Sequence, residues 1–395
     1  MYNIDHRKSS KTVEIKDQAG NLLKNTKVTV KQTNRDFLVG VNGFDVMMYA
    51  AGAKTDEERA FFKNRVDKLV DVFNFVTLPF YWGMFEGKEG ITLKDNYIQA
   101  VSFLKEKNIV VKGHPLCWHT VCCDWLLKYD DETIMQKQLA RIRREVGDFK
   151  GLVDSWDAIN ETVIMPEFDK YDNAVTRICK KYGRIPLIKA VFDEAIGCQS
   201  GAKFILNDFN TTSKYEKVIE ECLEAGVKID IIGIQSHQHQ GYWGKEKLLD
   251  VIERFSRFNI PIHFTENTMV SGDLIPDYIE DLNDWQVDEW PSTKEGEARQ
   301  ADEMEEMYRI LFAAPSVQAI TWWDLCDGAW LGAPSGVLRK DGSVKPVYDR
   351  LKNMVKNEWT TNYETSTDEN GILHLEGFKG KYDILVNGET IKATL

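Results

Sequence analysis

The feature that most constrains the fold of this chain is an alternation of short apolar runs with longer segments of helical periodicity, from about residue 36 to 358. The runs are nearly continuous in apolar residues, as is typical of parallel strands covered on both faces. Amphipathic segments lie between them, at residues 56–72, 131–149, 185–199, 245–258 and 293–312, and several begin with Asp, Ser or Thr in the N-cap position. We expect strands at residues 37–41, 73–78, 109–112, 155–159, 204–207, 231–235, 262–265 and 319–323.

Eight strands with intervening helices predict the α/β class, and a (β/α)8 TIM barrel in preference to a doubly wound sheet. A glycine-rich phosphate-binding loop does not follow the first run, which disfavours a nucleotide-binding fold. In such barrels the reactive groups follow the C-terminal ends of the strands. The residues that end each apolar run are therefore the candidates for chemistry.

The two ends of the chain alternate apolar and polar residues, as half-exposed strands do. Residues 11–15 and 27–31 are expected to form a hairpin around Gly20-Asn21, and the tail adds strands at 372–375, 382–386 and 389–394, the last two joined by Asn387-Gly388. Because an isolated hairpin is marginally stable, we expect the two ends to pair in one small accessory β domain. The predicted boundaries are 1–35 and 359–395 for this domain and 36–358 for the barrel. A packing role is favoured over carbohydrate binding.

Charge and hydropathy exclude several classes of partner. The net charge of −12 opposes binding to nucleic acid, because that affinity depends on Lys and Arg neutralising phosphates. Nothing approaches the roughly 18 consecutive apolar residues of a membrane span, and the N-terminus lacks the apolar region of a signal peptide. We expect a soluble protein with no membrane partner, either secreted or cytoplasmic.

The cysteines and histidines raise the alternative of a metal site. Seven cysteines, an odd number, do not suggest a disulfide framework. Cys117, Cys122 and Cys123 lie near His119, and His237 and His239 form a second pair, but neither group has further ligands at the usual spacing. We therefore favour reduced thiols and expect no metal.

Two carboxylic acids follow the ends of two predicted strands. Glu161 comes directly after Asn160, and Glu266 ends the run at 262–265. Two carboxyl groups suit the cleavage of a glycosidic bond, because one protonates the departing oxygen while the other meets positive charge at the anomeric carbon. A single such Glu is more often a solvated loop residue, but two at matched strand ends favour a site. Imidazole, amide and indole groups follow other strands, at His114, Trp118, Gln235, His237, Trp323 and Trp330.

These segments resemble the xylanases of glycoside hydrolase family 10. The similarity extends over about residues 36–358, and the motifs occur in the same order along the chain. They are Gly113-His114-Pro115-Leu116-Cys117-Trp118-His119, Trp156-Asp157-Ala158-Ile159-Asn160-Glu161, Asn207-Asp208-Phe209-Asn210, Gly233-Ile234-Gln235-Ser236-His237, Thr265-Glu266 and the segment from Trp323 through Asp327 to Trp330.

The resemblance implies a retaining β-glycosidase that hydrolyses β-1,4-linked xylan or xylo-oligosaccharides by double displacement, without a cofactor. Glu161 would be the acid/base and Glu266 the nucleophile. Asn160 would bind the 2-hydroxyl of the reacting sugar, and His237 would hold Glu266 ionised. The other substrate-binding residues implied are His114, Trp118, Gln235, Trp323, Trp330 and Tyr81.

The chain departs from the family pattern after the second strand. Where the family usually has Glu-Asn-x-x-Lys, this chain has Phe80, Tyr81 and Met84, and Thr268 replaces an Asp usually found two residues after the nucleophile. We expect an apolar wall there, with weakened recognition of the sugar in the next subsite. One alternative is therefore a hydrolase of the same mechanism acting on another β-glycoside, with an apolar group near Phe80 and Tyr81. A catalytically silent carbohydrate-binding barrel is the second, although Glu161 and Glu266 argue against it.

Overall fold

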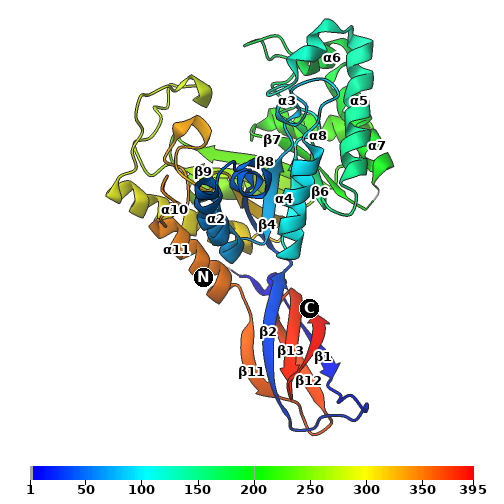
Figure 1. The fold of residues 1–395 in the computed structure, drawn as a ribbon, viewed down its shortest axis with the longest axis vertical. Coiled ribbons are helices and arrows are strands. Elements are labelled where there is room, and N and C mark those ends of the chain that lie inside the picture. Colours follow the sequence, from blue (N-terminus) through cyan, green and yellow to red (C-terminus); the bar gives the residue numbers. More distant parts are fainter. Residues whose placement is uncertain (1–2, 200) are drawn as a thin grey trace.

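The computed structural model describes residues 3–199 and 201–395, and its centre is a closed barrel of parallel strands in the order β10-β3-β4-β5-β6-β7-β8-β9 (Figure 1). The predicted (β/α)8 barrel is confirmed, and each strand begins within two residues of its expected start. The bounds are β3 (Leu38–Asn42), β4 (Phe75–Pro79), β5 (Val110–His114), β6 (Ser155–Asn160), β7 (Lys203–Asp208), β8 (Ile231–Gln238), β9 (Ile262–Met269) and β10 (Val317–Trp322).

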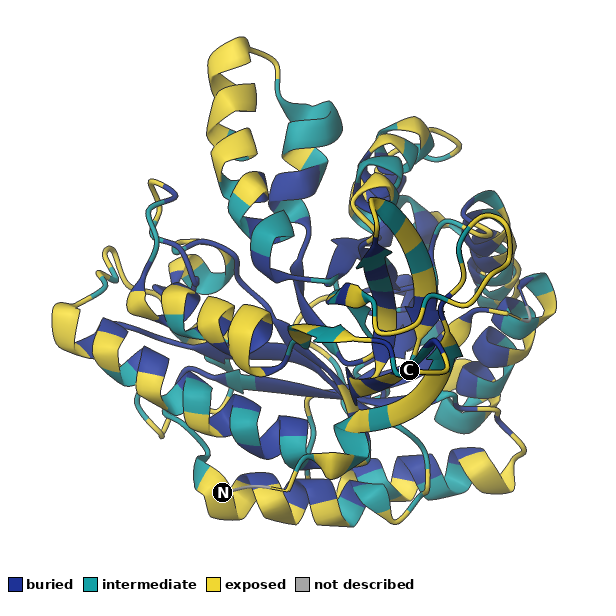
Figure 2. Cartoon of the chain, turned by 90° about the horizontal axis from the view of Figure 1, so that it is seen from below, coloured by how far each residue is buried: buried dark blue, intermediate teal, exposed yellow. Residues whose placement is uncertain are grey.

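Helices cover the barrel, and Figure 2 shows their inner faces buried and their outer faces exposed. Side chains cap several N-termini: Thr55 accepts from the Glu58 N–H, and Asp130 from the Thr133 N–H. In the described part of the chain, no helix is long and apolar enough to cross a membrane. The α-helices are α1 (Phe44–Met47), α2 (Asp56–Val72), α3 (Trp82–Phe85), α4 (Lys94–Glu106), α5 (Asp131–Asp148), α6 (Ala174–Tyr182), α7 (Arg184–Cys198), α8 (Ser213–Glu224), α9 (Gly244–Ser256), α10 (Lys294–Ala313) and α11 (Pro346–Asn353), and the shorter turns are η1 (Asp5–Arg7), η2 (Met48–Gly52), η3 (Asp124–Lys128), η4 (Leu282–Asp284), η5 (Trp330–Gly332) and η6 (Met354–Glu358).

Strands from both ends of the chain form two further antiparallel sheets, which we call the terminal sandwich. β1 (Lys8–Glu14) pairs with β12 (Ile372–Phe378), and the second sheet has the order β11 (Asn362–Ser366), β2 (Lys27–Arg35), β13 (Gly380–Val386), β14 (Glu389–Thr394). The two sheets share one apolar core, to which Val30, Leu375 and Ile384 contribute. The accessory sheets at the termini are thus present, while the domain boundaries at residues 35 and 359 stay a prediction.

The predicted N-terminal hairpin is wrong. Its two strands lie in different sheets, because β1 pairs with β12 whereas β2 lies between β11 and β13. Alternation of apolar and polar residues specifies the buried face of a strand, but not its partner. The C-terminal hairpin is confirmed: Asn387 and Gly388 have φ of 48° and 84° and join β13 to β14.

The terminal sandwich packs against the N-terminal ends of the barrel strands. β2 ends at Arg35 and β3 begins at Leu38, so the chain passes directly from one to the other. Arg7 donates hydrogen bonds to the carbonyls of Phe312, Ala314 and Val317, where α10 leads into β10. The C-terminal ends of the barrel strands therefore open on the side opposite the sandwich (Figure 1).

Candidate active site

A cavity of about 1310 Å³ lies at the C-terminal ends of the barrel strands. Asn160 lies beneath it, 1% exposed, and bonds to Glu161. The other predicted site residues line the cavity itself: Tyr81, His114, Trp118, Glu161, Gln235, His237, Glu266, Trp323 and Trp330.

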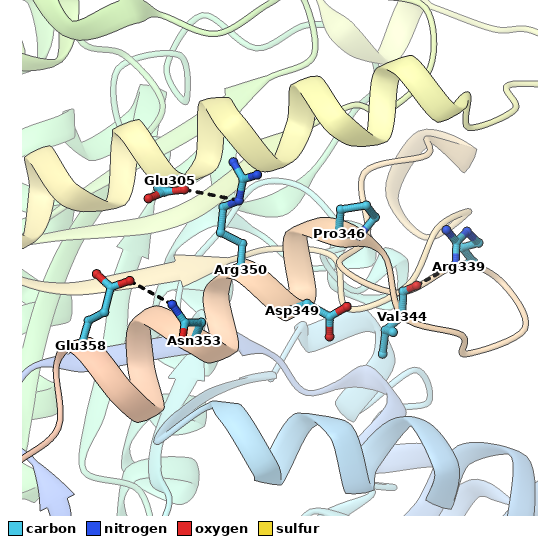
Figure 3. Close-up of a pocket in the computed structure, with 8 residues that line it drawn as sticks. All are labelled: Glu305, Arg339, Val344, Pro346, Asp349, Arg350, Asn353 and Glu358. Atoms are coloured by element: carbon cyan, nitrogen blue, oxygen red, sulfur yellow. Dashed lines mark hydrogen bonds and ion pairs between the residues drawn. The ribbon is translucent and has the colours of Figure 1, made fainter. Parts of the chain in front are cut away.

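A second hollow lies on the outer surface, beside α11 and facing α10 (Figure 3). Several of its polar groups contact one another: Arg350 Nε lies 3.3 Å from Glu305 Oε2, and Asn353 Nδ2 donates to Glu358 Oε1 at 2.9 Å. The contact with Glu305 joins α11 to α10, and the contact with Glu358 joins α11 to η6, which follows it directly. The predicted site residues lie instead at the barrel mouth, which makes that cavity the candidate active site.

Glu161 leaves β6 in a left-handed conformation, with φ of 57°, and its N–H donates to the Asn207 carbonyl at 2.8 Å. Such a φ is uncommon outside glycine and is a feature of functional sites. Trp118 Nε1 donates to Glu161 Oε2 at 2.9 Å, while the amides of Asn160 and Gln235 donate to Oε1, each at 3.3 Å. Several neighbours thus fix the orientation of this carboxyl group.

Burial raises the pKa of Glu161 to about 8, and the charges of Glu266 and Asp208 add to the effect. Hydrogen bonds from Trp118 and Gln235 favour the ionised form and partly offset this rise. Glu161 is therefore protonated at neutral pH and can give up a proton.

Glu266 lies within β9, and its two carboxylate oxygens face an amide donor and two imidazole rings. Asn207 Nδ2 donates to Oε1 at 2.9 Å, His237 Nε2 lies 3.3 Å from Oε2, and His114 Nε2 lies 4.0 Å from Oε1. Burial opposes ionisation, but the charges of His114 and His237 and the His237 hydrogen bond outweigh it, so the pKa of Glu266 lies below its usual value. Glu266 is a carboxylate at neutral pH.

Side chains within the barrel hold His114 in place. Asp157 Oδ2 lies 2.5 Å from His114 Nδ1 and 2.7 Å from Lys112 Nζ, and all three side chains are at most 1% exposed. Burial would raise the pKa of Asp157, but Lys112 and His114 hold it below its usual value. Sequence reasoning did not assign Lys112 or Asp157 to the site; the available signal was a charged residue inside a buried apolar run.

Asn207 connects the two carboxylic acids and was also missed as a site residue. Its Nδ2 donates to Asn160 Oδ1 at 2.8 Å as well as to Glu266, and its Oδ1 accepts from Thr265 Oγ1 at 2.7 Å. Asn160 in turn donates to Glu161. A continuous chain of amides therefore fixes the two acids relative to one another.

The predicted apolar wall is wrong at two of its three positions. Phe80 is fully buried in the core, with its ring centroid 4.8 Å from that of Trp156, and Met84 is half exposed outside the cavity. Only Tyr81 lines the cavity, 5.5 Å from the Trp118 ring. An apolar residue that follows a strand can face the core or the mouth, and sequence alone does not distinguish the two.

A (β/α)8 barrel with one protonated and one ionised carboxyl group at its mouth is the arrangement typical of glycosidases. The family model for glycosyl hydrolase family 10 matches residues 52–354. The chain belongs to glycosyl hydrolase family 10.

Individual relatives differ in how much of the chain they share. Anti-sigma-I factor RsgI6 of Acetivibrio thermocellus is 25% identical over 96% of this chain and 45% of its own length. An endo-1,4-beta-xylanase/feruloyl esterase of Xylanibacter ruminicola is 27% identical over 69% of this chain and 40% of its own length. The chain thus spans less than half the length of these curated relatives. Xylanase 10B of Thermotoga petrophila, solved with xylobiose, has the same fold, with a TM-score of 0.66 at 19% identity over 82% of this chain and 95% of that one.

Proposed function

We propose that this chain is a retaining β-glycosidase that hydrolyses β-1,4-linked xylan or xylo-oligosaccharides, with Glu161 as acid/base and Glu266 as nucleophile. The observation that carries this proposal is the pair of buried acids at the barrel mouth, joined by one chain of amides, with surroundings that shift their pKa values in opposite directions. Membership of family 10 and the xylanases among the relatives support the substrate.

In the first step, Glu266 attacks the anomeric carbon while Glu161 gives its proton to the departing glycosidic oxygen. The carbon–oxygen bond breaks, and the sugar becomes an ester of Glu266. In the second step, Glu161 takes a proton from water, the water oxygen attacks the anomeric carbon, and Glu266 leaves as a carboxylate. Because the ester has no negative charge, the pKa of Glu161 falls at that stage, which suits its change from acid to base.

The remaining predicted residues would hold the sugar. Trp118, Trp323, Trp330 and Tyr81 offer aromatic surface for the apolar faces of the ring. Asn160, Gln235 and His114 offer hydrogen bonds to its hydroxyls, with Asn160 placed for the 2-hydroxyl.

Substitution of each acid tests the assigned roles. Glu266→Ala is expected to lose activity on all substrates, by at least about 10³-fold, because the ester cannot form. Glu161→Ala is expected to keep appreciable ester formation from aryl β-xylobiosides whose leaving groups need no proton, and added azide should restore turnover with a β-glycosyl azide as product. Glu167→Ala, an exposed acid on the segment after β6, is the matched control. Equal losses in both variants on activated substrates would contradict the roles.

Stereochemistry tests the double displacement independently. Two inversions at one carbon give net retention, so proton NMR early in hydrolysis should detect the β-anomer first. Initial formation of the α-anomer would exclude Glu266 as the nucleophile.

A further inference from the structure

Two long segments meet beside the cavity, and a shared ion pair joins them. One segment, residues 161–173, leads from β6 to α6, and the other, residues 270–293, leads from β9 to α10. Lys170 Nζ, on the first, lies 2.6 Å from Asp281 Oδ2 and 2.8 Å from Asp284 Oδ1, on the second. We call these three residues the loop bridge. Figure 1 shows the yellow segment before α10 rising at the barrel mouth.

The loop bridge forms part of the boundary of the catalytic cavity. Phe168 lines the cavity from the first segment, and Glu280, Asp281, Leu282 and Asn283 line it from the second. Asp281 is held in place because its Oδ1 accepts from the Asn283 N–H at 2.8 Å, which leaves Oδ2 for Lys170. Gln240 also fixes the second segment, by donating to the Pro276 and Ile279 carbonyls at 3.0 and 2.8 Å.

The loop bridge lies at the leaving-group end of the cavity. The departing oxygen must be close to Glu161, the proposed acid, and His119 Nε2 lies 3.8 Å from Glu161 Oε2. The ring of Phe168 contacts the His119 ring, with centroids 4.4 Å apart, and Lys170 follows two residues later. The segment that carries Lys170 therefore borders the side toward which the leaving group departs.

A long polysaccharide must extend past both ends of the reacting sugar, whereas a short substrate need not pass between the two segments. We propose that the loop bridge restricts the leaving-group end, so that this chain favours short oligosaccharides or chain ends over interior bonds of a long β-linked polysaccharide. This inference rests on the proposed function and specifies which substrates that function would favour. The bridging side chains are between 39 and 63% exposed, so their pairing is weak and can open.

Removal of the bridging charge tests the inference. Lys170→Ala is expected to raise kcat/KM on soluble xylan about three- to tenfold relative to kcat/KM on an aryl β-xylobioside, the range expected from losing exposed ion pairs. The change should lie in KM for xylan, with kcat on the aryl substrate unaltered, because the acids are untouched. Lys170→Arg should restore the native ratio. Lys189→Ala, which removes a similarly exposed ion pair with Asp193 on α7, is the matched control and should leave the ratio unchanged.

Ionic strength provides a second measurement on the native chain. Between 0.01 and 1 M salt the screening length falls from about 30 to 3 Å, so the bridge should weaken and the xylan-to-aryl ratio should rise. Lys170→Ala should show no such rise. A ratio that is the same in the native chain and in Lys170→Ala would overturn the loop bridge while leaving the proposed function intact. A native chain inactive on both substrates would overturn the proposed function and this inference with it.

Discussion

Glu161 and Glu266 differ in protonation at neutral pH, and this difference fixes the expected pH dependence. Activity should fall toward high pH as Glu161 ionises near pH 8, and toward low pH as Glu266 becomes protonated, below the usual glutamate value of about 4.3. The profile of kcat/KM against pH reports both limits for the free enzyme.

Replacing Trp118, whose indole donates a hydrogen bond to Glu161, should shift only the alkaline limb of this pH profile. Trp118 donates to the Glu161 carboxylate and so favours ionisation; in Trp118→Phe the pKa of Glu161 should rise, and the alkaline limb should shift to higher pH. Trp243→Phe, which changes another indole of the cavity, is the control and should leave the limb in place. A limb that moves downward in Trp118→Phe would contradict the hydrogen bond as a cause.

The buried ion pair of Lys112 and Asp157, next to His114, should contribute strongly to the stability of the fold. Lys112→Met leaves Asp157 buried without its cation, and we expect a loss of about 3–5 kcal/mol in the free energy of unfolding at pH 7. The pKa of Asp157 is lowered in the native fold, so its pairing stabilises the fold above the unfolded pKa and is lost as pH falls through the folded one. The deficit of Lys112→Met in urea unfolding should therefore shrink on acidification. A variant as stable as the native chain at pH 7 would show that the pair is dispensable.

At the scale of elements, the contact between β5 and β6 depends on a glycine. A Cβ on Gly113 would lie 2.2 Å from Trp156 Cζ3, so Gly113→Ala must displace the Trp156 indole. We expect a loss of about 1–3 kcal/mol in unfolding free energy, measured by urea denaturation, together with reduced activity. Gly147→Ala is the control: its Cβ would meet nothing within 4 Å on α5, and we expect a gain of up to about 1 kcal/mol. Equal effects of the two substitutions would mean that β5 adjusts without moving Trp156.

Some features of these elements can be predicted from the sequence, and others cannot. Barrel strands such as 155–159 and 262–265 are predictable because strands buried on both faces need continuous apolar runs, and the polar residue that ends each run is then a candidate for the mouth. The pairing of β1 with β12 and the burial of Phe80 in the core cannot be predicted in this way, because both depend on contacts between residues distant in sequence. Asn207 was not assigned for a related reason. Its side chain links the two acids only when β6, β7 and β9 are assembled in one closed barrel, where β8 separates β7 from β9.

At the scale of the whole molecule, Arg7 fastens the terminal sandwich to the barrel. Its guanidinium donates to three carbonyls, at 2.6 to 2.8 Å, and lies 4.4 Å from the centroid of the Phe37 ring. Arg7→Met removes these three hydrogen bonds, and we expect a loss of about 2–4 kcal/mol in unfolding free energy. Differential scanning calorimetry should record a lower Tm, with Lys11→Met, on exposed β1, as the control. An unchanged Tm would indicate that the sandwich and barrel are held by other contacts, such as that of Phe378, on β12, with Phe312, whose ring centroids lie 5.9 Å apart.

Because the sandwich covers the N-terminal ends of the barrel strands and contains both β1 and β14, either chain end can carry an attachment without obstructing the cavity. A support surface, a fluorescent label or a fused module joined at the N- or C-terminus would leave the mouth facing outward. Immobilised preparations tethered through either end should therefore keep similar access to substrate. The same layout allows a second module to be joined in one polypeptide while the cavity of this barrel stays accessible.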